Sequence, residues 1–103
     1  MTKIIISCSQ GASSSTLVKR MRDYIAAENL DAEVLAATTD SIMAGEVEFD
    51  VILLGPQIRY EVKNLKEKFP DKPIDVMPML VYGRLNGKGA VDLALKMVEE
   101  HNG

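Results

Sequence analysis

The chain has 103 residues, of which 47% are hydrophobic and 26% are charged, and its net charge at pH 7 is −3. A chain of this length and apolar content forms one compact core, so we expect a single domain over residues 1–103. The mild negative charge argues against a nucleic-acid groove or a basic membrane-binding face. No apolar run approaches the roughly 18 residues that span a bilayer and no signal peptide is recognisable, which predicts a cytoplasmic protein. The single cysteine and single histidine are too few for a disulfide or a structural zinc site, and we expect neither metal nor cofactor.

Short apolar runs alternate along the chain with segments of helical spacing. The runs predict strands at Lys3–Ser7, Glu33–Thr38, Asp50–Leu54 and Pro73–Met77. Strands that alternate with helices and are apolar throughout are typical of a parallel sheet that is covered on both faces. The predicted fold class is therefore α/β, with an open, doubly wound parallel sheet.

The spacing of apolar residues predicts the helices between these strands. A short helix has Asp40 as its candidate N-cap and ends near Gly45. Longer helices carry apolar stripes at Leu17, Val18, Met21 and Ile25, then at Ile58, Val62, Leu65 and Phe69 up to Pro70, and finally at Val91, Ala94, Leu95 and Val98 after a start near Gly87–Gly89.

The segment C-S-Q-G-A-S-S-S, from Cys8 to Ser15, follows the first strand at the edge where ligands of such sheets gather. Gly11 permits a tight turn, and consecutive amides that lead into a helix hold an oxyanion or a phosphate. The same field stabilises a thiolate, so the pKa of Cys8 should lie below the usual value of about 8.5. The candidate phosphate-binding residues are Ser9, Gln10, Gly11, Ala12, Ser13, Ser14 and Ser15.

A free cysteine can also be a buried apolar residue, and a serine before a helix can simply be its N-cap. Capping needs one serine, however, and this segment holds several. Three chemical readings remain: a covalent phosphoryl carrier, a thiol enzyme similar to low-molecular-weight phosphatases or arsenate reductases, and a module that binds an anion without covalent chemistry. Tyrosine phosphatases clamp the phosphoryl group with an arginine six residues after the cysteine, where this chain has Ser14, which favours the carrier.

The sequence resembles the enzyme IIB component of the bacterial phosphoenolpyruvate-dependent sugar phosphotransferase system, lactose/cellobiose (chitobiose) class. The resemblance is carried by C-S-x-G-x-S-S-S, by V-I-L-L-G-P-Q-I-R-Y from Val51 to Tyr60, by K-P-I-D-V, and by Y-G-x-x-x-G from Tyr82 to Gly87. It implies a monomeric domain with a four-stranded parallel sheet. It also implies that Cys8 accepts a phosphoryl group from a phosphohistidine of the IIA component. The group then passes to a sugar, a β-linked disaccharide such as cellobiose, chitobiose or lactose, in the membrane permease IIC, which would be the only link to the membrane.

The remaining motifs fit this interpretation. Pro56, Gln57, Arg59 and Tyr60 follow the third strand and should share an edge of the sheet with Cys8, and together with Tyr82 they are candidates for contacts with a partner or with the phosphate loop. The glycine-rich segment Gly83–Gly89 misses the Walker spacing, so we interpret it as the turn into the last helix. His101 is expected to be a solvated residue of the C-terminal tail.

Overall fold

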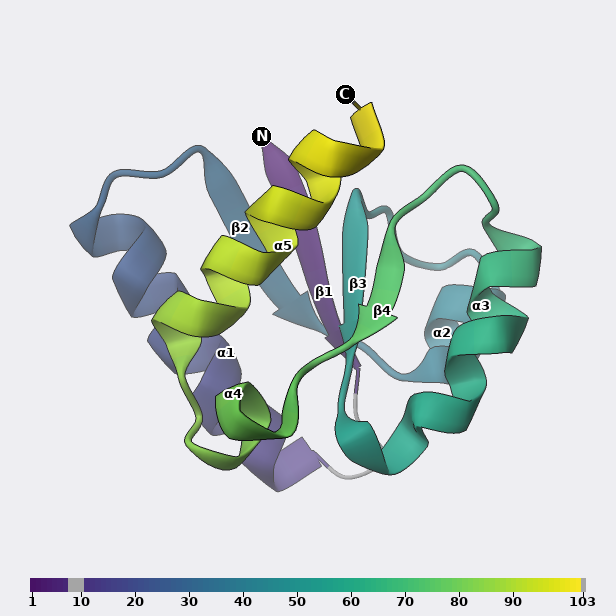
Figure 1. Cartoon of the computed structure of the whole chain (residues 1–103), viewed down its shortest axis with the longest axis horizontal. Helices are drawn as coiled ribbons and strands as arrows, with labels where there is room; N and C mark the ends of the chain where they lie inside the picture. Colours follow the sequence, from purple (N-terminus) through teal and green to yellow (C-terminus); the bar gives the residue numbers. More distant parts are fainter. Residues whose placement is uncertain (8–10, 103) are drawn as a thin grey trace.

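The computed structural model describes residues 1–7 and 11–102, and for residues 11–14 its description is limited to the backbone. Strands β1 (Thr2–Ser7), β2 (Ala32–Ala36), β3 (Val51–Leu54) and β4 (Ile74–Val76) form one sheet in the order β2-β1-β3-β4 (Figure 1). All three pairings in this sheet are parallel. The helices are α1 (Gly11–Ala27), α2 (Thr39–Met43), α3 (Val62–Lys68), α4 (Met79–Gly83) and α5 (Gly87–Asn102), with a 3-10 helix η1 (Pro56–Glu61) before α3. The predicted fold class is confirmed.

The two central strands are apolar throughout because each of their faces is covered. Ile4 and Ile6 of β1 point into one core, together with apolar residues of α1 and α5. Ile5 points to the other face, where residues of α2, η1 and α3 pack against it. Because side chains alternate between the faces of a strand, an uninterrupted apolar run supplies both cores at once. Figure 1 shows α1, α4 and α5 on one side of the sheet and α2 and α3 on the other.

Helices α1 and α5 approach each other closely at Gly87, the first residue of α5. A Cβ atom built at this position would lie 2.5 Å from the backbone carbon of Arg20. Farther along the two helices, the Tyr24 hydroxyl donates to the Asp92 carboxylate at 3.1 Å. Desolvation and this hydrogen bond raise the pKa of Tyr24. The glycine therefore sets the distance between two helices, one of which, α1, begins at Gly11 inside the predicted phosphate loop.

The N-cap of the short helix α2 lies two residues before the predicted cap. The N-cap is Thr38, whose extended backbone (φ −81°, ψ 157°) turns its side-chain oxygen to accept from the Ser41 amide at 3.1 Å. Asp40, the predicted cap, lies inside the first turn, where its carboxylate still suits the positive end of the helix. The predicted end is confirmed, since Gly45 adopts φ +76° directly after the C-cap Ala44. The strand before α2 is Ala32–Ala36 and not Glu33–Thr38, because Thr38 caps the helix.

The predicted helix over Ile58–Phe69 is two elements and not one. Ile58 has non-helical angles (φ −118°, ψ 28°) inside η1, and the regular α-helix starts only at Val62. Of the predicted stripe, Ile58 and Leu65 are buried, whereas Val62 and Phe69 are half-buried. The end before Pro70 is confirmed, because the residue before a proline is forced out of the helical region. The strands β3 and β4 are shorter than predicted, and helix α4 was not predicted.

The glycine-rich segment is the turn into α5, as predicted. Helix α4 ends at Gly83, Leu85 adopts φ +51°, and the Asn86 side-chain oxygen accepts from the Gly89 amide at 3.0 Å. His101 is exposed, as expected, but it belongs to the last turn of α5, and its Nε2 donates to the Asp71 carbonyl at 2.6 Å. It therefore fixes the end of α5 against the α3–β4 turn and is not a loose tail residue.

Candidate functional site

The strands of the sheet all end on one side, here called the carboxyl edge, and the candidate site lies along it (Figure 1). Strand β1 ends at Ser7 and helix α1 begins at Gly11. The predicted nucleophile Cys8 and its neighbours Ser9 and Gln10 lie outside the described residues. Their place in the chain is fixed by Ser7 before them and Gly11 after them.

The helix begins earlier than expected, so most of the predicted loop is the first turn of α1. Gly11, Ala12, Ser13, Ser14 and Ser15 all belong to the helix, and Ser15 is exposed. The first four amides of a helix have no partner within the helix, and they point back toward the preceding residues. No acidic side chain occupies this first turn. The N-terminus of α1 therefore presents donors and partial positive charge at Gly11, the first described residue after the cysteine segment.

Ser7 is a residue that the sequence did not single out. Its side chain is fully buried, and its Oγ has no hydrogen-bond partner among the described residues. Its carbonyl accepts from the Gly55 amide at 2.8 Å, which joins the end of β1 to the end of β3. A serine at the end of an apolar strand carries no sequence signal of burial, so only the structure shows this hydroxyl directly before the cysteine.

Two elements form the rim of the carboxyl edge beside this point. Pro56, directly after Gly55, begins η1, and the Met77 amide donates to the Leu54 carbonyl at 2.8 Å, which places the start of α4 next to η1. Between them lies a cavity of about 230 Å³, here called the rim cavity, lined by Pro56, Gln57, Arg59, Met79, Tyr82 and Gly83.

Four of the five rim residues proposed from the sequence thus share one cavity. Arg59 Nη1 also donates weakly to the Pro56 carbonyl, at 3.4 Å. Tyr60, the fifth, is not part of the lining; its side chain is 70% exposed.

Large apolar side chains stand in solvent on the same rim. Met79 and Leu80 of α4 are 76% and 71% exposed, and α4 has no buried residue. With Tyr60 they make up most of the exposed large hydrophobic residues in the described part of the chain. Clustered exposed apolar groups mark a surface that contacts another molecule. The sequence did not reveal this feature, since the helix that carries it was not predicted.

The Arg20 side chain is engaged in contacts within the fold. Arg20 of α1 donates through Nη1 to the carbonyls of Arg84 and Leu85 at 3.3 and 3.2 Å, which ties α1 to the turn before α5. A phosphatase-type clamp needs a guanidinium that is free to hold the phosphoryl group with two parallel bonds. Arg20 is used instead for structure.

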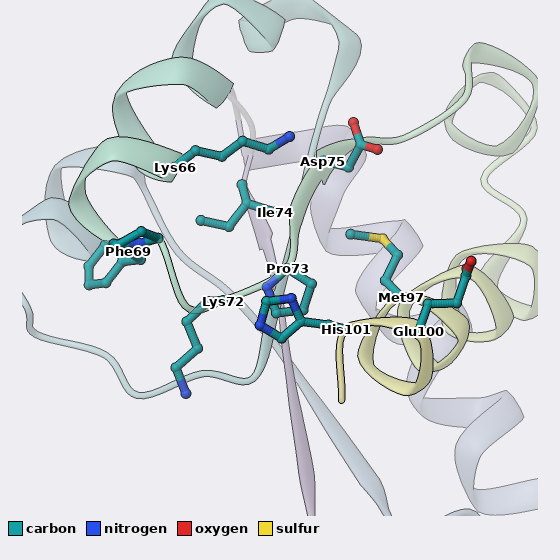
Figure 2. Close-up of a pocket in the computed structure, with 10 residues that line it drawn as sticks. Lys66, Phe69, Lys72, Pro73, Ile74, Asp75, Met97, Glu100 and His101 are labelled. Carbon is teal, nitrogen blue, oxygen red and sulfur yellow. The ribbon is translucent and has the colours of Figure 1, made fainter. Parts of the chain in front are cut away.

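A cavity larger than the rim cavity lies at the opposite end of the sheet. It measures about 540 Å³ and is walled by side chains of α3, β4 and α5 (Figure 2). His101, Glu100 and Met97 line one side, and Lys66 and Phe69 line the other. Because it lies beside the start of β4, it is separate from the carboxyl edge. In the described part of the chain, no group of three or more His, Cys, Asp or Glu side chains could hold a metal ion, and no helix could cross a bilayer.

Comparison with known proteins gives a family match over most of the chain. The model of the family described as "PTS system, Lactose/Cellobiose specific IIB subunit" matches residues 3–93. The chain is 33% identical over 101 residues to the oligo-beta-mannoside-specific EIIB component of Bacillus subtilis (strain 168), which covers 95% of this chain and 97% of the relative. It is 34% identical over 91 residues to the galactose-specific EIIB component of Lactococcus lactis subsp. cremoris (strain MG1363), with 82% and 84% covered.

Solved structures show the same similarity. The solution structure of a cellobiose-specific phosphotransferase IIB component protein from Borrelia burgdorferi has a TM-score of 0.80 and 31% identity, over 97% of this chain and 94% of that one. The lactose-specific IIB component domain from Streptococcus pneumoniae has a TM-score of 0.75 and 20% identity, over 97% and 96%, which supports the fold alone.

Proposed function

The chain belongs to the lactose/cellobiose-specific IIB family of the sugar phosphotransferase system, as its motifs predicted, and we propose that it carries the phosphoryl group on Cys8. IIB components act as phosphotransferases in sugar uptake. The observation that carries the proposal is the position of the only cysteine, between the end of β1 and the first turn of α1, in a chain that matches the family over residues 3–93.

The proposed reaction has two transfers. The Cys8 thiolate attacks the phosphorus of a phosphohistidine on the IIA component, so that an S–P bond forms and the N–P bond breaks, and the histidine nitrogen recovers its electron pair. A hydroxyl of the sugar in the IIC permease then attacks the same phosphorus. An O–P bond forms, the S–P bond breaks, and the hydroxyl proton leaves to solvent. We expect the amides at the start of α1 to favour the Cys8 thiolate and the phosphocysteine, so that the pKa of Cys8 lies below the usual value of about 8.5.

A thiol hydrolase is the alternative, and its requirements are poorly met. Ser14 stands where a phosphatase needs its arginine, and Arg20 is bound to the carbonyls of Arg84 and Leu85. Without a clamp on the transferring group, water gains little help in attacking it. The phosphocysteine should therefore persist until an acceptor docks.

The partners fit the rim of the carboxyl edge. The exposed side chains of Tyr60, Met79 and Leu80 offer an apolar surface beside the predicted phosphate loop. IIA and IIC would use this surface in turn, each bringing its reacting group to Cys8. The protein acts in the cytoplasm as one domain over residues 1–103, and it reaches the membrane only through IIC. Its sugar is a β-linked disaccharide such as cellobiose, chitobiose or lactose.

A monomer suits a carrier that serves two partners. The two outer strands of the sheet, β2 and β4, both carry features that oppose the addition of a strand from a second chain. The Pro73 carbonyl and the Met77 amide, at the two ends of β4, are hydrogen-bonded to β3. The backbone amide of Val76 therefore points away from β3, and it donates to the Asp75 carboxylate at 2.8 Å. On the other edge, the Val34 carbonyl of β2 accepts from Arg22 Nε and Nη2 at 3.2 and 3.0 Å. Charged side chains on edge groups oppose pairing with a second chain.

Sedimentation of Arg22→Ala and Asp75→Ala tests the monomer. We expect the wild type to stay monomeric and the variants to self-associate as concentration rises. Lys19→Ala and Glu67→Ala, which make the same charge changes at exposed helix positions, should stay monomeric. A wild-type protein that already sediments as a dimer would contradict the proposal.

The experiment for the carrier is phosphoryl acceptance by Cys8→Ser. Serine keeps the size of the side chain but is far less acidic, so the variant should unfold at the same urea concentration as the wild type and accept no phosphoryl group from phosphorylated IIA. Intact mass after incubation measures acceptance. Ala27→Ser, at the exposed last residue of α1 and outside the predicted phosphate loop, is the control and should still be phosphorylated. Acceptance by Cys8→Ser at the wild-type rate would rule out Cys8 as the carrier.

A further inference from the structure

We propose that the rim cavity between η1 and α4 is a subsite for the acceptor sugar, so that this chain contributes to sugar recognition along with the permease. The inference rests on the proposed function, since it supposes that a sugar hydroxyl approaches Cys8. Its ligand class is a single pyranose ring of a neutral saccharide.

The position of the cavity is the first argument. The Gly55 amide is bonded to the carbonyl of Ser7, the residue directly before Cys8, and the cavity wall starts at the next residue, Pro56. A sugar hydroxyl that attacks phosphorus must come within about 3–3.5 Å of it, so the rest of its ring lies within a few ångströms of the rim. The rim cavity is a concavity of the described carboxyl edge at this place.

The chemistry of the lining is the second argument. Tyr82 contributes an aromatic ring, Gln57 an amide that both donates and accepts, and Arg59 a guanidinium that donates. A pyranose presents apolar C–H faces and a belt of hydroxyl groups, which need such a combination of ring and polar side chains. The lining contains no carboxylate that would repel the phosphoryl group entering or leaving nearby.

The volume of the cavity limits the size of the ligand that it can hold. Sites for drug-sized molecules measure roughly 300–1,000 Å³, whereas this one measures about 230 Å³ and is open to solvent on one side. It accommodates one ring and not a whole disaccharide, which leaves the second ring to the permease. Binding by this chain alone should therefore be weak, in the millimolar range.

Gly83 allows the cavity to be filled without disturbing the fold. A Cβ atom at this position meets no atom within 4 Å, so Gly83→Val places a branched side chain into free space. Ala27→Val is the matched control, because Ala27 is likewise the exposed last residue of a helix, α1, and is remote from the lining. Tyr82→Phe and Gln57→Ala then remove single polar groups and keep the wall.

The direct test is a titration of isotope-labelled Cys8→Ser protein, followed by amide chemical shifts. We expect cellobiose or lactose at up to about 100 mM to shift amides of residues 56–59 and 79–84 in this protein and in its Ala27→Val form, and not in its Gly83→Val form. The absence of any shift at that concentration would overturn the inference. Equal shifts with inorganic phosphate alone would also overturn it, since they would show only an anion contact at Arg59.

The functional test separates this inference from the proposed function. Transfer from phosphorylated IIA to Gly83→Val should stay within about twofold of the wild type, while transfer onward to sugar in vesicles that hold IIC should fall about tenfold, through the KM for sugar. If only the concentration of IIB needed for half-maximal rate rises, the cavity receives the permease protein and not the sugar, and the inference is wrong. Failure of Cys8 to accept phosphate would be seen in the first step, whereas the titration is independent of it.

Discussion

Replacing Gly87 by alanine tests whether α1 and α5 are held at the distance that the structure shows. The added Cβ would lie 2.5 Å from the Arg20 backbone carbon and 2.7 Å from both the Arg20 oxygen and the Met21 nitrogen. Ordinary contact begins at 3.4 Å, so the helices must separate by about 0.9 Å. The obstructing atoms are backbone, which cannot move aside without shifting the whole of α1.

The magnitude follows from two opposing effects. Overpacking of a well-filled interior costs about 1–3 kcal/mol, and a clash with backbone belongs at the upper end of that range. Alanine in place of glycine in a helix recovers about 0.5–1 kcal/mol. We therefore expect Gly87→Ala to lower the free energy of unfolding by about 2 kcal/mol, which corresponds to a fall in Tm of roughly 8–16 °C.

Urea unfolding at 25 °C measures this change through the midpoint, with an unchanged slope. Gly83→Ala is the control, because its Cβ meets nothing within 4 Å, and it should equal the wild type or exceed its stability by about 0.5 kcal/mol. A midpoint for Gly87→Ala at or above that of the wild type would show that the helices do not pack this closely.

Two further predictions concern local interactions. Thr38→Ala removes the cap of α2 and should cost about 1 kcal/mol in urea unfolding, whereas Asp40→Ala should cost less, since Asp40 is not the cap; equal losses would restore Asp40 as the cap. Desolvation and the Asp92 hydrogen bond raise the pKa of Tyr24 above 10.0, so the folded protein holds the phenol proton more tightly than the unfolded chain does. The resulting stabilisation is complete below pH 10 and is lost as pH rises through the higher folded pKa. Asp92→Asn should move the Tyr24 phenolate absorbance to lower pH, and an unmoved titration would contradict this coupling.

The sequence predicted those parts of the fold that a short pattern determines. The apolar run around Ile5 predicts a strand with two covered faces, and Pro70 predicts a helix end through a local steric clash. The cap of α2 was misplaced because threonine and aspartate both cap well, and the choice between them depends on where the preceding strand ends. Helix α4 was missed because it has only five residues and two of its apolar residues, Met79 and Leu80, face solvent, so it shows no amphipathic period.

The candidate site was predictable in the same uneven way. Cys8 and the residues after it were singled out from their types and spacing alone, since a cysteine before small residues and a helix has few structural uses, and their role stays a prediction. The sequence predicted only that Gln57, Arg59 and Tyr82 lie near the cysteine. The cavity that these residues share arises from the parallel pairing of β3 with β4, which no local pattern shows. The buried hydroxyl of Ser7 depends on tertiary packing, which no local pattern encodes.

Phosphorylation of Cys8 should be felt close to the carboxyl edge and hardly at all in the sheet. A phosphoryl group brings nearly two negative charges and three acceptor oxygens to amides at the start of α1, and charge-assisted hydrogen bonds are stronger than neutral ones. The amides from Gln10 to Ser15 should therefore exchange more slowly with solvent in the phosphorylated protein. The strands are already held by two buried clusters, one on each face, so their exchange should change little.

Such a local response suits a carrier, because the surface near Cys8 can then differ for its two partners while the scaffold that positions η1 and α4 stays the same. Hydrogen exchange on the two forms measures this, with Cys8→Ser treated with phosphorylated IIA as the control. Slowed exchange spread evenly over all four strands, or none between Gln10 and Ser15, would contradict the proposed role of the α1 amides.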